Sequence, residues 1–477
     1  MRSPSSPSRV LSASWPTLLV AVSTLTPLTL AHAAGFEVPD NGTRAVGRGG
    51  AVAASSEDLT AAHFNPALLA RQSSSLSLLY NHNLVFHEST FTRAPLSEGW
   101  GARGAQADTS EVSDRETLFP LGVFVAGGTN FGLEDAMFAA SIYGPHSNGK
   151  QNWPDYGPQS FMLTETDLIL VYYSASAAWS NGDRFGIGVT LQYVDMPKLE
   201  YELVMDARVD PESDPVPDRA RAGVVSSQTA SKLDLEDRFG YTAIVGAFVK
   251  ITDHLELAAG GRVLPVKLDA KGGIHIDNEA LNPQGLKVEM PLTLPRTARV
   301  GLRYVDPGFD VELDFVWENW SVIDKYHANM EGTIQGQPVN DLVIEKQWQD
   351  SMGVRLGGDV ALVPGKLDVR AGGFVESGAA PKNYSHIDFP SFDRLGLSGG
   401  LTFHLDTVGV PGLALSAAYS HIFQEDREVT EAYGKTFQQR PKAPCPERCE
   451  GLSGVVANAG RFETSFDIVS VGLDYRR

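Results

Sequence analysis

Fourteen short runs of alternating apolar and polar residues constrain this chain more than any other feature of its sequence. In the first run, Leu76, Leu78 and Tyr80 share one face of an extended strand, whereas Ser77 and Asn81 lie on the other. Such a strand has one apolar side and one polar side. The runs begin at Ser75 and recur at Leu118–Gly127, Ala136–Tyr143, Phe161–Trp179, Arg184–Met196, Phe239–Ile251, Leu255–Lys267, Leu292–Val305, Phe309–Trp320, Trp348–Leu362, Leu367–Glu376, Leu395–Leu405, Leu413–Gln424 and Phe462–Tyr475.

A chain with this pattern can cross a membrane only as a barrel. A spanning helix needs about 20 consecutive apolar residues, and the chain beyond its N-terminal leader offers no such run. A closed barrel satisfies its backbone hydrogen bonds between strands and needs only one apolar face on each strand. The sequence therefore predicts an all-β protein, a fourteen-stranded antiparallel transmembrane β-barrel over residues 73–477.

The connections between the runs are of two kinds. Tight-turn residues join some runs, at Asn181–Asp183, Thr252–His254, Asp306–Gly308 and Val363–Gly365. Long polar segments join others, at Ser89–Thr117, Pro197–Arg238, Ser321–Gln347 and Glu425–Arg461. Short turns at one end and long loops at the other are typical of outer-membrane barrels, and an even strand number places both chain termini at the short-turn end.

Residues 1–33 have the features of a secretory signal peptide. Arg2 and Arg9 precede a moderately apolar run, and Ala31-His32-Ala33 forms an A-x-A cleavage signal. The chain of 477 residues has a formal net charge of −19 and no basic cluster, which argues against a nucleic-acid partner. We therefore expect a multi-pass, porin-like protein in the outer membrane of a Gram-negative bacterium.

Residues 34–72 are rich in Gly and Ala and predict a compact N-terminal helical hatch that the barrel encloses. The Ser55-x-x-Asp58 spacing marks a helix N-terminus, so we expect a short helix over about Glu57–Phe64. This helix must end at the Asn65-Pro66-Ala67 sequence, because proline disfavours helical backbone in the residue before it. A turn is predicted there.

Two cysteines, Cys445 and Cys449, lie close together in a polar stretch near the C-terminus. An exported protein meets an oxidising compartment, so a local disulfide is expected. A metal site would need further ligands, and no His or other Cys lies nearby. The Gly396–Gly400 sequence spells G-x-S-x-G within an alternating run, whereas a nucleophile elbow needs a strand, turn and helix. We expect no enzyme activity, no cofactor and no metal.

The Asn65-Pro66-Ala67 turn, the fourteen runs, Trp317-x-x-Trp320 and the Arg370-x-Gly372-Gly373-Phe374 strand together resemble the FadL family, over the whole mature chain. These outer-membrane proteins transport long-chain fatty acids and other hydrophobic compounds. The resemblance implies capture of a ligand at the outer loops, a hatch near the periplasmic side, and sideways release beside a kinked third strand. We expect a monomer in contact with outer-membrane lipid that takes up long-chain fatty acids, with aromatic hydrocarbons as the alternative.

The resemblance also assigns residues to this route. Asn65, Pro66 and Ala67 match the hatch turn, and Gly35-Phe36 matches the extreme N-terminus that plugs the ligand pocket. Gly144-Pro145 falls where the third strand should be interrupted, and proline cannot donate to a strand ladder. The alternative that Pro145 only begins the next loop remains open.

The sequence says less about the chemical identity of the ligand than about the fold. A fatty-acid carboxylate should meet basic groups, and Lys198 and Arg262 lie near predicted strand ends on suitable sides, whereas an aromatic or alkane ligand would not need them. Two other classes of function remain as alternatives, a surface adhesin with long acidic loops and an outer-membrane lipid hydrolase. An adhesin has no need of a hatch, and no convincing Ser and His arrangement supports a hydrolase.

Overall fold

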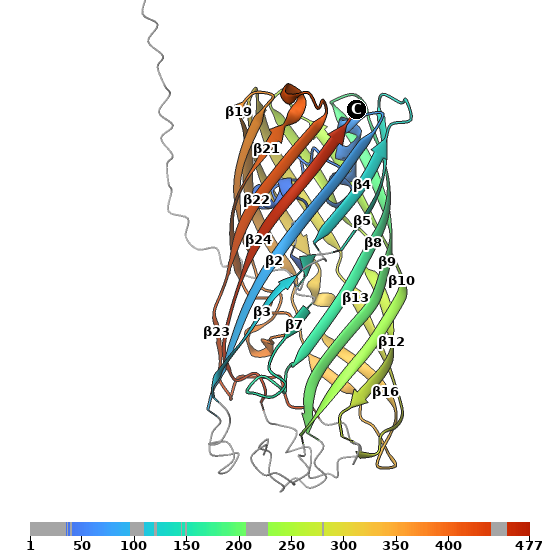
Figure 1. Cartoon of the computed structure of the whole chain (residues 1–477), viewed down its shortest axis with the longest axis vertical. Coiled ribbons are helices and arrows are strands. Elements are labelled where there is room, and N and C mark those ends of the chain that lie inside the picture. The colour runs from blue at the N-terminus through green and yellow to red at the C-terminus, as the bar shows by residue number, and fades with distance from the viewer. Residues whose placement is uncertain are drawn as a thin grey trace, which may run out of the picture. The chain divides into compact units, whose positions relative to one another are not determined.

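The wall of the protein is a closed barrel. The computed structural model describes residues 35, 37–38, 41–95, 109–118, 122–144, 146–147, 150–206, 228–278, 281–439 and 456–477. Within these residues the chain forms a closed antiparallel barrel of fourteen wall strands, which confirms the predicted fold class. The barrel closes where β2 (Ser77–Arg93) pairs along its whole length with β24 (Gly460–Arg476) (Figure 1).

Bulges and breaks divide several wall strands into two or more labelled segments. The first half of the wall contains β2, β3 (Glu111–Leu118), β4 (Val123–Thr129), β5 (Ala136–Tyr143), β7 (Lys150–Asn152), β8 (Glu165–Ser180), β9 (Phe185–Asp206), β10 (Gln228–Lys250), β11 (Leu255–Arg262) and β12 (Val266–Ile276). The second half contains β13 (Gln284–Leu294), β14 (Thr297–Asp306), β15 (Phe309–Glu318), β16 (Lys325–Ile334), β17 (Gln337–Pro338), β18 (Leu342–Glu345), β19 (Ser351–Val363), β20 (Leu367–Glu376), β21 (Arg394–His404), β22 (Leu413–Gln424), β23 (Arg427–Val429) and β24. Outside the hatch, the described residues also form the short 3-10 turns η4 (Trp320–Val322), η5 (Lys382–Tyr384) and η6 (Leu405–Val408).

The third wall strand is interrupted. Its pairing with β8 stops where Tyr143 meets Tyr172 and resumes where Lys150 meets Asp167. Gly144 directly follows β5, and Pro145 lies outside the described residues. Between the two halves, β6 (His146–Ser147) pairs with β1 (Glu37–Val38), a short strand near the N-terminus. The wall is therefore broken at the point where the N-terminal segment meets it.

The outward face of the wall shows where the apolar band ends. On β9, Leu191 and Tyr193 are exposed apolar side chains, whereas Lys198 lies further along in an outward charged cluster. β9 has 22 residues and β10 has 23, so both extend well past an apolar band about 25 Å tall. The four segments predicted as long loops all contain strand residues, so that prediction was too broad. Beyond the band the outward side chains face water, and polar residues there do not mark the end of a strand.

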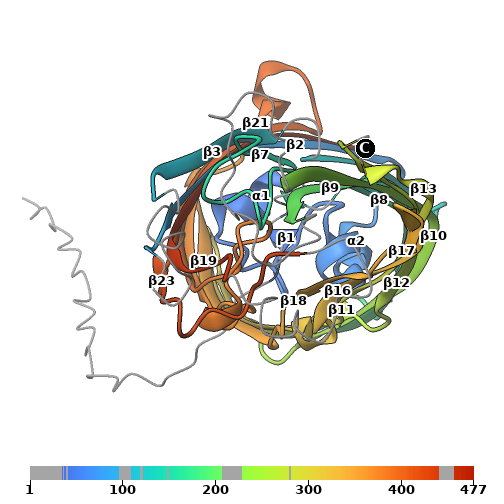
Figure 2. The ribbon, with the colours of Figure 1, turned by 90° about the horizontal axis from the view of Figure 1, so that it is seen from below.

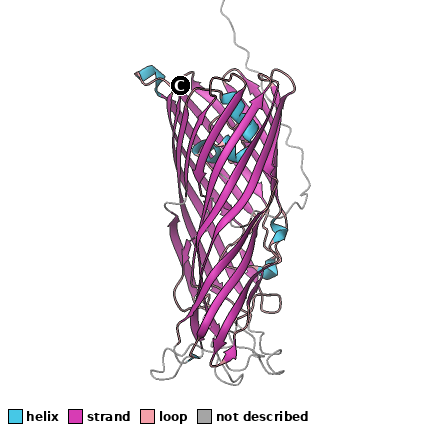
Figure 3. Ribbon diagram, turned by 90° about the vertical axis from the view of Figure 1, so that its right-hand side faces the viewer, coloured by secondary structure: helices cyan, strands magenta, loops and turns pink. Residues whose placement is uncertain are grey.

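Three short helical elements form the hatch: α1 (Thr43–Gly47), α2 (Ala61–Phe64) and the 3-10 helix η1 (Pro66–Gln72). They lie inside the ring of strands (Figure 2), in the half of the barrel that carries the short turns (Figure 3). The predicted helix ends at Phe64 as expected but begins only at Ala61. The Asp58 carboxylate accepts a hydrogen bond from Thr60 N at 2.8 Å, which makes a local turn before the helix. None of the described helices is long and apolar enough to cross a membrane.

The two ends of the barrel should differ in accessibility on intact cells. Gln337 is exposed in β17, which pairs with the end of β16 at the long-loop end, and Lys366 is exposed in the short turn between β19 and β20 at the other end. In a chain with Cys445 and Cys449 replaced by Ser, we expect Gln337→Cys to react with a membrane-impermeant maleimide on intact cells. Lys366→Cys should react only after lysis, because we expect the short turns to face the periplasm. Labelling of Lys366→Cys alone on intact cells would reverse this orientation.

Candidate transport site

The hatch is fastened to the wall at the Asn65-Pro66-Ala67 turn. Asn65 has extended backbone between α2 and η1, and its side-chain oxygen accepts a hydrogen bond from Ala67 N at 3.2 Å. Its side-chain nitrogen donates to Ala53 O at 2.9 Å and to Ala247 O of β10 at 3.2 Å. One buried amide thus joins the turn, the hatch loop and the wall, and each such hydrogen bond contributes about 1 kcal/mol.

The wall beneath this turn is a row of three paired glycines. Gly188 of β9 pairs with Gly246 of β10, which pairs in turn with Gly260 of β11. A Cβ on Gly246 would stand 1.9 Å from Asn65 Oδ1, and a Cβ on Gly188 would stand 2.4 Å from the backbone carbon of Pro66. These distances are shorter than any van der Waals contact, so the turn can approach the wall only where no side chain projects.

A second glycine pair receives the end of α1. Gly357 of β19 pairs with Gly372 of β20, and a Cβ on either would come within 2.3 Å of the Arg48 backbone. The Arg48 side chain is fully buried, with Nη1 2.8 Å from Asp310 Oδ1 and Nη2 3.2 Å from Glu312 Oε2. Removing one partner from a buried ion pair costs about 3–5 kcal/mol, so this contact fixes α1 firmly.

Inward carboxylates of β15 also bind the backbone of the hatch. Asp310, Glu312 and Asp314 are spaced by two residues and therefore share the inner face of the strand. Asp314 Oδ2 accepts hydrogen bonds from Val52 N and Ala53 N at 2.9 Å each, and Glu312 Oε1 accepts one from the next backbone nitrogen at 2.6 Å. These side chains satisfy buried N–H groups that lie outside any helix or strand.

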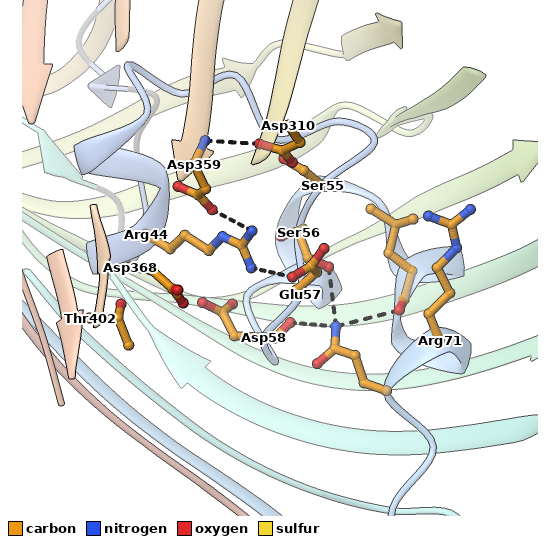
Figure 4. A network of polar contacts seen from close by, with 12 residues as sticks. Arg44, Ser55, Ser56, Glu57, Asp58, Arg71, Asp310, Asp359, Asp368 and Thr402 are labelled. Atoms are coloured by element: carbon orange, nitrogen blue, oxygen red, sulfur yellow. Dashed lines mark hydrogen bonds and ion pairs between the residues drawn. The ribbon is translucent and has the colours of Figure 1, made fainter. Parts of the chain in front are cut away.

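A charged network lies on the short-turn side of the hatch, where it adjoins turn residues such as Gly308, and Figure 4 shows its contacts around Arg44. Arg44 donates to Glu57 at 2.8 Å and to Asp359 at 2.6 Å, and Arg303 donates to Glu57 at 2.7 Å. Burial alone would raise the pKa of Glu57, but the charges and hydrogen bonds of Arg44 and Arg303 hold the pKa of this carboxyl well below its usual range. These groups line a polar cavity of about 440 Å³, which is unfavourable surroundings for an apolar molecule.

The N-terminal segment lies beside a buried tryptophan. Gly35 is buried, and its carbonyl oxygen accepts a hydrogen bond from Arg394 Nη2 at 3.2 Å. A Cβ at this residue would stand 2.5 Å from Cε3 of Trp320, so a larger residue would collide with the indole ring. Only two residues further along, β1 pairs with β6 in the interruption of the third wall strand. The N-terminal segment therefore connects the lumen to the break in the wall.

An apolar cavity lies in the barrel toward the long-loop end. It contains about 40 Å³ of empty space, and none of the described residues that line it carries a charge. The space is too small for a long acyl chain, so a molecule of that size would fit only if the lining side chains moved apart. Leucines and methionines supply much of the lining, and methionine is the most adaptable of the apolar side chains. Lining residues include Leu168, Leu170, Met196, Leu199, Met290 and Leu294.

A buried ion cluster adjoins this cavity. Lys346 Nζ lies 2.7 Å and 2.6 Å from the two carboxylate oxygens of Asp388, and both side chains are fully buried. His386 Nδ1 lies 2.7 Å from Asp388 Oδ1, and the Tyr201 hydroxyl donates to Asp388 Oδ2 at 3.2 Å. Tyr201 and Phe389, the residue after Asp388, both line the cavity, so the cluster borders it directly.

The protonation of this cluster follows from its burial and its charges. Burial alone would raise the pKa of Asp388, but the charges and hydrogen bonds of His386 and Lys346 hold it well below its usual range. Burial lowers the pKa of Lys346 and the pKa of His386, against the opposing effect of Asp388. Asp388 is therefore ionised, and the ammonium group of Lys346 is its counter-charge.

The predicted carboxylate contacts lie in different places. Arg262 is buried, and its guanidinium lies 5.4 Å from the ring centre of the inward-facing Tyr172. Lys198 instead pairs with Asp167 at 2.8 Å and Glu200 at 3.2 Å on the outward face. Opposite Ile169 a register shift in β9 changes which residues point inward, and the sequence pattern alone did not reveal it.

Other predicted residues cannot be placed, and some important ones were not predicted. Phe36, Cys445 and Cys449 lie outside the residues that the structure describes. Sequence reasoning missed the glycine row and the Lys346 and Asp388 pair. Inward-facing glycines within strands rich in apolar residues are a signal that could have revealed the row.

Filling the glycine row should loosen the hatch. Gly246→Ala would place a methyl group against Asn65 Oδ1, and such overpacking costs about 1–3 kcal/mol. We expect faster hydrogen–deuterium exchange in the peptide over residues 61–72, measured by mass spectrometry, while the barrel remains folded.

Gly273→Ala is the matched control, since the atom nearest to its added Cβ would be 3.8 Å away. Equal exchange in both variants would show that the close approach of the turn to the wall does not hold the hatch.

The sequence matches one protein family over most of its length. Residues 24–453 match the family described as outer membrane protein transport protein (OMPP1/FadL/TodX). No curated protein sequence gave a significant match. The family consists of outer-membrane transport channels and not of enzymes.

Solved structures share the fold at low sequence identity. A FadL homologue from Pseudomonas aeruginosa superposes with a TM-score of 0.73 at 16% identity, over 93% of this chain and 100% of the other. The toluene transporter TodX from Pseudomonas putida gives 0.63 at 14% identity, over 92% and 98%. The toluene transporter TbuX from Ralstonia pickettii gives 0.61 at 13% identity, over 92% and 99%. The chain belongs to the FadL/TodX family of outer-membrane proteins that transport hydrophobic compounds.

Proposed function

We propose that this protein takes up long-chain fatty acids, which bind in the apolar cavity and leave sideways through the break in the third wall strand. The proposal rests on one observation: the hatch is held firmly inside the barrel, whereas the wall has a break. Buried contacts fasten the hatch to β10, β15, β19 and β20, whereas the wall itself is interrupted between Tyr143 and Lys150.

Electrostatics favour the sideways route over one through the hatch. A ligand moving past the hatch would enter the polar cavity that contains Arg44, Glu57 and Arg303. An apolar chain gains nothing there and would separate charged groups that are paired with one another. Beside the break, the outward side chains of Ile142 and Tyr173 are exposed and apolar, so the break adjoins the apolar band and leads to lipid, and the ligand need not enter water.

Aromatic side chains lie on the inner side of the break. The ring of Tyr143, the last residue of β5, stacks on Phe124 at 4.8 Å and on Tyr172 at 5.3 Å. Leu170, which lines the apolar cavity, is the next inward-facing residue on the strand that carries Tyr172. Tyr143 OH also lies 3.0 Å from Nδ1 of His63 in α2. The hatch therefore helps to position the aromatic side chains that would line the ligand's path.

The N-terminal segment is the gate in this proposal. Gly35 packs on Trp320, and β1 occupies the break by pairing with β6. By pairing with β6, β1 holds the two ends of the break in position, while Asn65, Pro66 and Ala67 keep the rest of the hatch in place. Gly144 and Pro145 then mark the first residues of the lateral opening.

Aromatic hydrocarbons are the second candidate, because TodX and TbuX are toluene transporters. The cavity is lined mostly by apolar side chains, together with the tyrosines Tyr201 and Tyr326, which favours a ligand that is apolar along its length and polar at one end. Arg262 offers a further polar contact near Tyr172, on the way to the break.

Uptake by living cells decides between the two ligands. Cells that lack their own transporter should accumulate a labelled long-chain fatty acid faster when they produce this protein, with no change in toluene uptake. Faster uptake of toluene alone would favour the aromatic hydrocarbon and contradict our assignment.

Removal of the gate should impair transport without preventing assembly. We expect deletion of residues 35–40 to reduce fatty-acid uptake, because the segment that couples the lumen to the break is lost, while the wall strands begin only at Ser77. Heat-modifiable migration on gels would report assembly, and Gly273→Ala is the matched control. Normal uptake by an assembled deletion variant would rule out the gate.

A further inference from the structure

One buried hydroxyl group in the apolar cavity lacks a partner. Tyr326 of β16 lines the cavity and is 7% exposed. Among the described residues, its hydroxyl group has no hydrogen-bond partner. Buried tyrosine hydroxyls ordinarily have one, because a buried polar group that bonds to nothing is costly. An arriving ligand with an oxygen atom would supply the missing acceptor.

The second tyrosine of the cavity differs in this respect. The Tyr201 hydroxyl is already bonded, to Asp388 Oδ2 at 3.2 Å and to Met162 O at 3.3 Å. Tyr326 is held by aromatic neighbours instead, with ring centres 6.5 Å from Trp348 and 6.5 Å from Phe389. Its hydroxyl is therefore fixed in position and available to a ligand.

The charges around the cavity argue against an anionic head group. Lys346 Nζ lies 4.8 Å from the centre of the Tyr326 ring, but both oxygens of Asp388 already bind this ammonium group. The described residues that line the cavity include no lysine, arginine or histidine. A carboxylate anion would enter this space without a counter-charge of its own, which is unfavourable.

We propose that the cavity takes its ligand with an uncharged polar end, and that the Tyr326 hydroxyl donates a hydrogen bond to the ligand oxygen. A protonated fatty acid and a fatty alcohol both meet this requirement, whereas an alkane and a carboxylate anion do not. This inference rests on the proposed function, because it names the form in which the same site accepts its ligand.

Binding to the purified protein in lipid nanodiscs tests the proposal. The ligands are dodecanol, dodecane and dodecanoate, each delivered from cyclodextrin at mildly alkaline pH, where the acid is ionised in water. Trp348 packs against Tyr326, so its fluorescence should report occupancy, and Trp348→Phe identifies its signal. We expect dodecanol to bind at least about fivefold more tightly than dodecane, the effect of one hydrogen bond, and more tightly than dodecanoate, whose charge has no counter-charge in the cavity.

Tyr326→Phe removes the hydroxyl and keeps the ring. This variant should weaken dodecanol binding about fivefold and leave dodecane binding unchanged. Tyr433→Phe is the matched control, because Tyr433 is 51% exposed and does not line the cavity.

The outcomes separate this inference from the proposed function. Unchanged dodecanol binding by Tyr326→Phe, or tightest binding of dodecanoate by the unaltered protein, would overturn the uncharged-ligand proposal and leave fatty-acid uptake intact. If the unaltered protein binds none of the three ligands, the cavity is not the ligand site and both proposals are wrong.

Discussion

The inward carboxylates of β15 are the contacts on which the hatch depends. The hatch buries large apolar side chains such as Leu59, Phe64 and Leu69, but its loop also buries backbone N–H groups that no helix or strand satisfies. Asp310, Glu312 and Asp314 compensate by binding Arg48 and three successive backbone nitrogens. Each buried N–H without a partner would cost about 1–3 kcal/mol, so these carboxylates stabilise the conformation of the hatch loop. The barrel thus supplies the polar core that the hatch lacks.

The strands of the barrel could be predicted from the sequence, but most of the site could not. Alternation is a local property, so the run from Leu76 to Phe86 already identifies a strand. The end of α2 at Phe64 was also predictable, because Pro66 disfavours helical backbone at the preceding residue, Asn65. The contacts of Asn65 with Ala247 and Gly246 join segments about 180 residues apart, and no local pattern encodes them. The bulge that turns Lys198 outward escaped prediction for the same reason.

The lumen of the barrel has two kinds of surface, one at each end. Toward the short-turn end the surface is charged, and its arginines and carboxylates are paired with one another. Toward the long-loop end the surface is apolar and adjoins one neutralised ion cluster. A hydrophobic molecule is stable only in the second region, and the break after Tyr143 lies beside it. In the function that we propose, the hatch, the cavity and the interrupted strand act together to direct an apolar ligand sideways.

A covalent link between the hatch and the wall tests most directly whether the ligand avoids the hatch. Thr43 of α1 and Ser470 of β24 have hydroxyl oxygens 2.8 Å apart, which suits replacement of both by cysteine in a chain whose native cysteines are Ser. Sideways release predicts the same rate of fatty-acid uptake with this disulfide oxidised and reduced. Uptake that stops on oxidation and returns on reduction would show that the hatch must leave the wall, and would contradict the sideways route.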